Sequence, residues 1–243
     1  MTSTARRALV TGSSGMIGAA ICRRLARAGH FVYAQAHRGA AAAEALVADI
    51  IAAGGSAQLL VFDITDGAAT HAQLETVLGA GAIQILVNNA GIHDDAAFPG
   101  MNAEQWRRVI DVSVNGFFNV TQPLILPMIR TRWGRIVSTS SVTALMGNRG
   151  QVNYAAAKGA LNSATRALAL EVASRGITVN AVAPGIIATG MTDNMFDDEA
   201  IARMVPMKRA GLPEEVAGLV AFLVSEEAAY LTAQVISING GMI

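Results

Sequence analysis

Short runs of apolar and β-branched residues alternate along the chain with longer segments whose apolar residues recur every three or four positions. The short runs predict strands and the longer segments predict amphipathic helices. The expected strands are 8–11, 31–35, 58–62, 83–87, 135–140, 178–183 and 235–238, and the expected helices are 16–28, 40–53, 67–79, 103–130, 152–174 and 213–224. This alternation predicts an α/β fold: a Rossmann-like, doubly wound parallel sheet of seven strands with helices on both faces.

Composition narrows the class of protein. The chain has 243 residues, of which 52% are hydrophobic, so we expect one domain spanning 1–243. Its 18 basic and 18 acidic side chains balance, which favours neither a nucleic-acid partner nor a membrane surface. The single cysteine, Cys22, falls on the apolar side of a predicted helix and cannot form an internal disulfide. A buried thiol in a soluble, cytoplasmic protein is therefore expected.

A glycine-rich segment joins the first expected strand to the first expected helix. Glycine there lets the backbone approach a pyrophosphate, and the helix N-terminus offers N–H groups to its charge. A plain tight turn is the alternative interpretation. The segment consists of Gly12, Ser13, Ser14, Gly15, Met16, Ile17 and Gly18.

The ends of the second and third strands would face the adenosine half of a dinucleotide. No acidic residue is present where NAD-binding proteins hold the ribose; His37 and Arg38 follow the second strand instead. They favour a 2′-phosphate, and so NADPH, with help from Ser13 or Ser14. Arg38 could equally be a solvated loop charge. Asp63 could accept a hydrogen bond from the adenine amino group or cap the following helix.

Three residues in the second half of the chain form a candidate catalytic group. Lys158 follows Tyr154 by four residues, so both lie on one face of the predicted helix, and Ser141 follows a predicted buried strand. A neighbouring ammonium is expected to lower the pKa of the Tyr154 phenol and make it a usable proton donor. The alternative is a half-buried tyrosine beside a solvated lysine.

Together these motifs resemble the short-chain dehydrogenase/reductase family over residues 6–241. Further points of resemblance are Asn88-Asn-Ala-Gly91, Pro184-Gly185 followed by Thr189 and Met191-Thr192, and the tail Ile238-Asn-Gly-Gly241. The resemblance implies that Tyr154 protonates a carbonyl oxygen, Ser141 positions that oxygen and Lys158 binds the nicotinamide ribose. It also implies cofactor contacts at Asp63, Ile64, Asn89, Ala90, Gly91, Pro184, Gly185, Ile187 and Thr189.

Two positions depart from the family pattern. The common pattern has a glycine at the position of Met16, and Gly15 stands where a basic residue often contacts the 2′-phosphate. Ser113 occupies the position of a catalytic asparagine that supports a water relay to the lysine. We hypothesise that Ser113 holds this water through its hydroxyl. Asn115 cannot stand in for it, because two residues along a helix turn the side chain to the opposite face.

Within the family the likeness is to bacterial 3-oxoacyl-ACP reductases, carried by Met146–Tyr154, Glu171–Asn180 and Pro206-Met-Lys-Arg; Asn148–Val152 also resembles the ketoreductases of aryl-polyene-like assembly lines. It implies reduction of a 3-oxoacyl group on an acidic acyl carrier protein, a homotetramer, no metal, and a substrate lid at about 187–210. Arg132 and Arg175 match carrier-docking arginines, with Arg130 and Arg135 adding charge nearby, although all could be solvated helix-end charges. Another ketone or alcohol, such as an acyl-CoA, sugar or steroid, is the alternative substrate. A non-catalytic NADPH sensor or scaffold is a third possibility.

Overall fold

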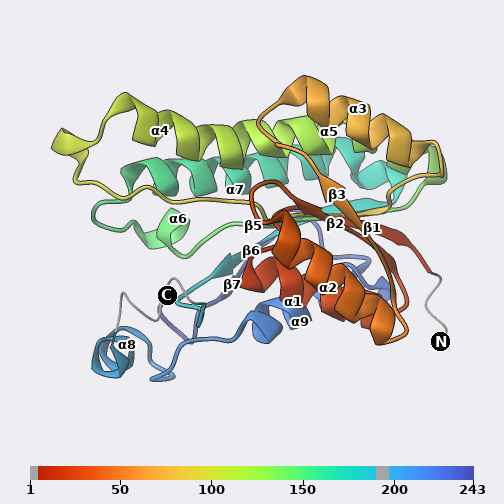
Figure 1. The fold of residues 1–243 in the computed structure, drawn as a ribbon. Helices are drawn as coiled ribbons and strands as arrows, with labels where there is room; N and C mark the ends of the chain where they lie inside the picture. The colour runs from red at the N-terminus through yellow and green to blue at the C-terminus, as the bar shows by residue number, and fades with distance from the viewer. Residues whose placement is uncertain (1–4, 190–196) are drawn as a thin grey trace.

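A parallel seven-stranded sheet forms the middle layer of the molecule (Figure 1), in a computed structural model that describes residues 5–189 and 197–243. The strand order is β3-β2-β1-β4-β5-β6-β7, and every pairing is parallel. The predicted doubly wound sheet is therefore confirmed. The strands are β1 (Arg7–Val10), β2 (Phe31–Ala36), β3 (Ser56–Val61), β4 (Ile85–Asn88), β5 (Gly134–Thr139), β6 (Ile177–Pro184) and β7 (Val235–Ile238).

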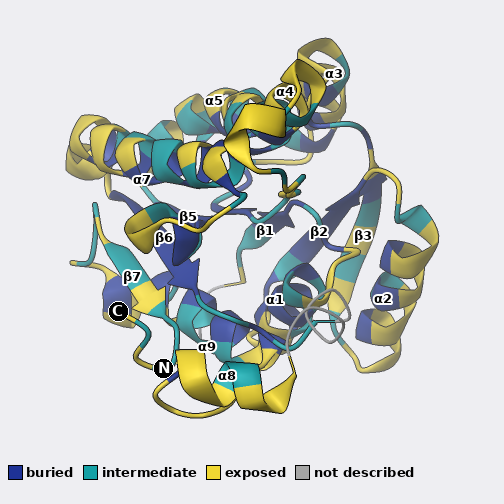
Figure 2. Ribbon diagram, turned by 90° about the vertical axis from the view of Figure 1, so that its left-hand side faces the viewer, coloured by how far each residue is buried: buried dark blue, intermediate teal, exposed yellow. Residues whose placement is uncertain are grey.

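Helices cover both faces of this sheet (Figure 1). One layer holds α3 (Gly67–Leu78), α4 (Ala103–Ile110), α5 (Gly116–Thr131) and α7 (Val152–Val172), and the other holds α1 (Met16–Arg27), α2 (Ala40–Ala52) and α9 (Pro213–Leu223). Side chains alternate along each strand, so Leu9 enters the core under the first layer and Val10 the core under the second. Figure 2 shows the buried central strands, the more exposed edge strands β3 and β7, and exposed residues on the outer sides of the helices.

The predicted helix 103–130 is interrupted. The chain is helical through this region, but Asp111–Asn115 form a turn of π-helix between α4 and α5. Hydrophobic spacing does not specify one inserted residue in a hydrogen-bond register, so the pattern predicted a continuous helix. Two short helices were also missed, α6 (Thr143–Met146) and α8 (Asp198–Met204). Helices this short carry too few turns for a recognisable period.

The strand order reverses at the centre of the sheet. From β1 the chain proceeds outward through β2 to β3. It then returns to β4 on the other side of β1 and proceeds outward through β5 and β6 to β7. Ligands bind parallel sheets beside such a point, outside the carboxyl ends of the strands. These ends point to the left in Figure 1, toward α6 and α8, and toward the viewer in Figure 2.

Two further expectations concern the burial of Cys22 and the substrate lid. Cys22 is a free, buried thiol, and burial raises its pKa to about 12, which confirms the expected buried cysteine. Among the described helices, none combines the length and the apolar character needed to cross a membrane. The expected lid at 187–210 includes α8, whereas Met191 and Thr192 lie outside the described residues.

Candidate active site

The structure brings Ser141, Tyr154 and Lys158 together at the carboxyl end of β5. Ser141 follows this strand, and the other two residues occupy the first turns of α7. Tyr154 forms a hydrogen bond with Ser141, and the Lys158 Nζ atom lies 5.7 Å from the centre of the Tyr154 ring. Lys158 is only 2% exposed and donates a hydrogen bond to the Thr139 carbonyl oxygen at 2.8 Å. The hydroxyl, phenol and ammonium thus form one connected group.

The pKa of Tyr154 is shifted in the direction opposite to the one expected from sequence. Burial raises it, the Ser141 hydrogen bond partly opposes this, and the charge of Asp95 raises it further. The expected net lowering of the Tyr154 pKa is therefore wrong for this structure, because burial and the Asp95 charge dominate it. The ammonium is held by Thr139, and burial lowers the pKa of Lys158 itself to about 8. The phenol stays protonated near neutral pH, which is the form that donates a proton.

The segment after β4 shapes the space around Lys158. A Cβ atom added to Gly91 would lie 2.8 Å from Lys158 Nζ, so the missing side chain makes room for the ammonium. Asn89 donates hydrogen bonds to the carbonyl oxygens of Thr11 and Gly12 at 3.1 and 3.2 Å, and the Ala90 N–H donates to Thr11 Oγ1. The end of β4 is thereby fixed to the glycine-rich turn.

The glycine-rich turn fits a pyrophosphate. Gly12 has a φ of +66°, and a Cβ atom on Gly18 would lie 2.3 Å from the Gly12 carbonyl oxygen, so the turn and helix meet at backbone distance. Helix α1 begins at Met16 after Gly15, with no side-chain cap and no acidic residue in its first turn. The helix therefore places no acidic side chain of its own first turn at the positive end of its dipole, the end that favours an anion.

One of the two serines proposed for the 2′-phosphate is wrong. The Ser13 side chain is fully buried and donates to the Gln35 carbonyl oxygen at 2.9 Å, so it cannot face a cofactor phosphate. Ser14 is exposed, and its hydroxyl oxygen lies 2.6 Å from the position of a Cβ atom added to Gly39. Ser14 therefore lies against the loop that carries His37 and Arg38, both of which are exposed.

Asp63 joins this cluster rather than capping a helix. Its carboxylate lies 3.4 Å from His37 Nδ1 and accepts hydrogen bonds from the Thr65 N–H and hydroxyl. Burial raises its pKa, but these hydrogen bonds and the charges of His37 and Arg38 outweigh burial and lower it. The cap of α3 is Asp66, so the capping alternative for Asp63 is wrong. The neighbouring Ile64 side chain is in the core, and only its backbone can reach a cofactor.

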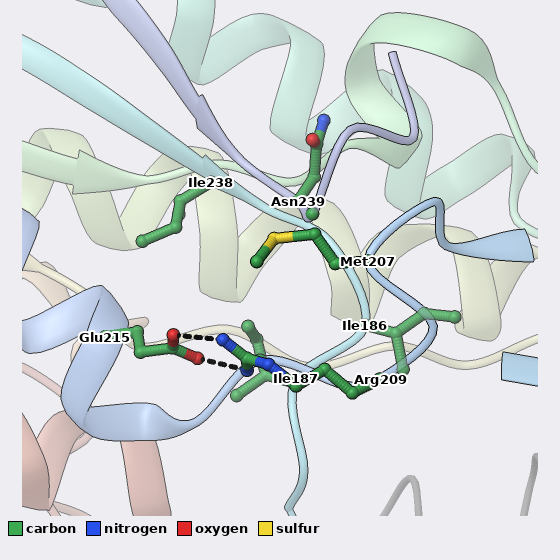
Figure 3. A pocket seen from close by; sticks show the side chains of 9 residues that line it. Ile186, Ile187, Met207, Arg209, Glu215, Ile238 and Asn239 are labelled. Carbon is green, nitrogen blue, oxygen red and sulfur yellow. Dashed lines mark hydrogen bonds and ion pairs between the residues drawn. The ribbon is translucent and has the colours of Figure 1, made fainter. Parts of the chain in front are cut away.

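The expected nicotinamide end lies beyond β6. Pro184 ends this strand, Gly185 donates a backbone hydrogen bond to the Ile238 carbonyl oxygen, and Ile187 is buried and bridges to Gly211. Thr189 is the last described residue before the gap. Beneath this segment is a mainly apolar cavity of about 80 Å³, too small for a drug-sized ligand (Figure 3). The paired side chains of Arg209 and Glu215, 2.6 and 2.8 Å apart, line it.

Ser113 lies in the π-helical turn and is 2% exposed. Within the described parts of the chain its Oγ atom has no hydrogen-bond partner. Asn115 instead donates a hydrogen bond to Asp111 Oδ1 at 2.7 Å on the exposed side. This position agrees with the prediction that Asn115 cannot replace the catalytic asparagine. A buried hydroxyl without a protein partner is a suitable site for a water molecule.

The proposed docking arginines lie at the other edge of the sheet. Arg132 ends α5 just before β5, and Arg175 lies just before β6, so both are at the amino ends of strands whose carboxyl ends carry the site. Arg135 is 3% exposed, pairs with Glu226 at 3.3 Å and stacks on Trp133. It therefore adds no surface charge, contrary to expectation.

Three residues beside Tyr154 were missed from the sequence. His93, Asp95 and Gln151 are linked by polar contacts, and the His93 ring meets the Tyr154 ring edge-on. The signal was His93-Asp-Asp95, a run of titratable side chains directly after Asn88–Gly91. The described residues contain no cluster of three or more histidine, cysteine or acidic side chains able to hold a metal.

Comparison with known proteins identifies the family to which this fold and site belong. Residues 6–200 match the family described as short chain dehydrogenase. The chain is 45% identical to the "3-oxoacyl-[acyl-carrier-protein] reductase FabG" of Aggregatibacter actinomycetemcomitans, covering 96% of this chain and 98% of that protein. It is 42% identical to the protein of that name in Escherichia coli (97% and 96% covered), and 41% identical to an "Acetoacetyl-CoA reductase" of Acinetobacter (97% and 96% covered). The family match, these relatives and the geometry together establish that the chain belongs to the short-chain dehydrogenase/reductase family.

Proposed function

We propose that this protein is an NADPH-dependent reductase of 3-oxoacyl thioesters carried on acyl carrier protein. The observation that carries the proposal is the protonated Tyr154 phenol, hydrogen-bonded to Ser141 and next to Lys158, beside a turn that fits a dinucleotide. The names of the similar proteins supply the substrate class: two are named 3-oxoacyl-ACP reductases and one an acetoacetyl-CoA reductase. The exposed His37 and Arg38 support NADPH over NADH.

In this mechanism the chain's own residues handle the oxygen and the proton. Bound NADPH supplies the hydride to the 3-oxo carbon. The Ser141 hydroxyl holds the carbonyl oxygen, and Tyr154 donates its proton as negative charge develops there. The nearby Lys158 ammonium stabilises the phenolate that remains. Ser113 holds a water molecule that helps to return a proton through Lys158.

The test is cofactor oxidation with acetoacetyl thioesters on carrier protein and on CoA, each with NADPH and with NADH. We expect the carrier-linked substrate and NADPH to give the highest kcat/KM, and Tyr154→Phe to lose about 100-fold or more of the activity. Cofactor binding without turnover on either thioester would overturn the reductase proposal and would favour the NADPH-sensing alternative.

A reductase for another ketone is the second candidate, supported by the relative named acetoacetyl-CoA reductase. Equal kcat/KM for the CoA and carrier thioesters would favour it over the carrier-linked function. Turnover of a sugar or steroid ketone but of neither thioester would move the assignment outside acyl reduction. The catalytic residues are the same in each case, so Tyr154→Phe serves as the control throughout.

The proposal includes a cytoplasmic homotetramer without a nucleic-acid or membrane partner. Exposed apolar side chains on the outer helices support assembly: Phe118 and Leu126 of α5 are 63% and 61% exposed, and Leu170 of α7 is 82% exposed. The buried, unpaired Cys22 supports a reducing compartment. Light scattering tests the assembly, and a monomer at assay concentration would contradict it.

Carrier docking by Arg132 and Arg175 requires this assembly. Within one subunit the two arginines and Tyr154 lie at opposite ends of the strands, so they cannot surround one opening. An antiparallel partner packed on α5 and α7 would bring its amino-edge arginines toward the carboxyl edge of its neighbour. We therefore propose that the arginines serve the active site of a partner subunit.

A further inference from the structure

The loop after β4 is fastened to the start of α7, the helix that carries Tyr154. Asp95 Oδ2 accepts a hydrogen bond from Gln151 Nε2 at 2.9 Å, and Asp95 Oδ1 lies 3.2 Å from His93 Nδ1. Gln151 Oε1 in turn accepts from Asn148 Nδ2 at 2.9 Å. The Ala96 N–H also donates to the Gly150 carbonyl oxygen at 2.9 Å. Asp95 is therefore held in place by groups on both segments.

His93 connects this carboxylate to the candidate proton donor. The His93 and Tyr154 rings are 6.4 Å apart between centroids and almost perpendicular, at 82°. Burial is the main cause that raises the pKa of Tyr154, and the Asp95 charge raises this pKa further. A negative charge near a partly buried phenol disfavours the phenolate, because the two like charges repel each other.

We propose that Asp95, held by His93 and Gln151, is a positioning residue that keeps Tyr154 in its neutral, proton-donating form and so favours reduction of a ketone over oxidation of an alcohol near neutral pH. The inference rests on the proposed function, since it requires Tyr154 to be the proton donor. It adds a group that neither the catalytic motif nor the similarity to named reductases assigns.

Other charged groups near Tyr154 do not replace Asp95 in this role. Lys158 on α7 acts in the opposite direction while it is charged, and because its pKa is about 8 this effect decreases above that pH. From α4, Arg108 pairs at 3.1 Å with Asp94, whose second oxygen accepts from Gln105. Asp94 is thus turned toward α4 and compensated. His93 Nδ1 lies 3.2 Å from Asp95 Oδ1, so a His93 variant is needed to separate the contribution of the imidazole from that of the carboxylate.

The experiment compares Asp95→Asn with Asp94→Asn, which removes the same charge one residue away. Asparagine at 95 can still accept from Gln151, so the loop should remain fastened. The chain has three tyrosines, and labelling them with ¹³C at Cζ allows the Tyr154 resonance, assigned with Tyr154→Phe, to be titrated by NMR. We expect the Tyr154 resonance to titrate at lower pH in Asp95→Asn than in the unaltered protein. In Asp94→Asn it should titrate at the same pH as in the unaltered protein.

The pH profiles of both reaction directions give a second measurement. Reduction requires the phenol and is lost as pH rises through its pKa, whereas oxidation requires the phenolate and appears through the same range. Asp95→Asn should therefore move both limbs to lower pH and increase alcohol oxidation at pH 7.5. Rates that fall in both directions with unmoved limbs would show a merely structural role and overturn the inference.

Two controls separate the possible failures. If Tyr154→Phe keeps its activity, the proposed proton donor is wrong, and the inference fails with it. If Tyr154→Phe is inactive but the Tyr154 resonance titrates at the same pH in Asp95→Asn, only the inference fails. His93→Gln keeps the carboxylate, so it should not move the limbs to lower pH; a downward shift equal to that of Asp95→Asn would assign the effect to loop geometry and overturn the role of the carboxylate.

Discussion

At the scale of single residues, burial decides the chemistry of Lys158. The ammonium lies in the protein interior with the Thr139 carbonyl oxygen as its hydrogen-bond acceptor, and burial lowers its pKa to about 8. A lysine placed at a site that disfavours its charge indicates a functional rather than a stabilising role. It also links catalysis to the pH dependence of folding.

Lys158→Met should abolish activity and remove this pH dependence. In the unfolded chain lysine binds its proton up to about pH 10.4, but in the folded protein it releases it above about pH 8, so the unfolded state binds more protons between these values. The free energy of unfolding of the unaltered protein, relative to that of Lys158→Met, should therefore increase by about 1 kcal/mol per pH unit above pH 8. Urea unfolding at pH 7.5 and 9.5 measures this. An unchanged difference would place the ammonium in contact with solvent.

Gly15→Arg should strengthen the NADPH preference. Gly15 is exposed, has an ordinary φ of −81°, and its added Cβ atom would meet only the Gly12 carbonyl oxygen at 3.6 Å. A guanidinium there could reach a 2′-phosphate. We expect this contact to contribute about 1 kcal/mol to binding, which lowers the KM for NADPH by about fivefold. Steady-state kinetics with both cofactors test this, and Gly15→Gln is the uncharged control. An equal change for NADH would contradict phosphate recognition.

Sequence spacing was sufficient for some residues of the site and not for others. Tyr154 and Lys158 are four residues apart on one helix, so local geometry alone predicted their proximity. The burial that raises the pKa of Tyr154 depends on tertiary packing, as does the inward turn of the Ser13 hydroxyl, and both were predicted wrongly. Asp95 is 59 residues from Tyr154 in sequence, so no local pattern could connect them.

At the scale of elements, the π-helical turn at Asp111–Asn115 changes which side chains face the site. Ser113 is buried, and its hydroxyl has no hydrogen-bond partner in the part of the chain that the structure describes, whereas Asn115 donates a hydrogen bond to Asp111 on the exposed side. π-turns occur frequently at functional sites because the extra residue re-aims its neighbours. The same element therefore explains both the missed helix boundary and the place of Ser113.

Ser113→Ala should lower kcat with little change in KM. Loss of one hydroxyl that holds a water is worth about 1 kcal/mol, or about fivefold in rate, and stability should not fall because the hydroxyl has no partner among the described residues. Steady-state kinetics and thermal unfolding measure the two effects. Asn115→Ala, in the same turn, is the matched control and should leave kcat unchanged. An unaltered kcat and pH profile in Ser113→Ala would exclude the relay role.

The strands and long helices were predictable because burial of apolar side chains determines where they form. The central strands β1, β2, β4, β5 and β6 are short apolar runs buried between two helical layers, whereas the edge strands β3 and β7 are more exposed. The pattern alone located all seven to within a few residues. The exceptions are elements fixed by hydrogen bonds rather than by burial. Helix α8 is one of these: it begins with the side chain of Asp197 accepting from the Ala200 N–H, and it contains no fully buried residue.

At the scale of the whole molecule, the two edges of the sheet have different properties. The carboxyl edge carries the glycine-rich turn, Ser141 and Tyr154, and the amino edge carries Arg132 and Arg175. The length of the strands between them keeps the arginines away from the site of their own subunit. A carrier protein can meet both only where two subunits lie antiparallel.

Mixing two variants that are each inactive on the carrier-linked substrate tests whether the arginines act across subunits. Tyr154→Phe keeps the arginines but lacks the proton donor, and the double variant Arg132→Glu/Arg175→Glu keeps the donor but repels an acidic carrier. In a mixed dimer the intact Tyr154 of one subunit lies beside the intact arginines of the other. Co-expression should therefore restore about a quarter of the carrier-linked activity, because random mixing makes half the dimers mixed and each has one complete site.

The same experiment with a small free ketone provides the control. The double variant should already be active on this substrate, since no carrier has to dock, and co-expression with Tyr154→Phe should add nothing. If the arginines acted within their own subunit, every intact Tyr154 would remain beside reversed charges, and mixing would restore no carrier-linked activity. A double variant that is as active on carrier-linked substrate as the unaltered protein would instead exclude docking at Arg132 and Arg175 altogether.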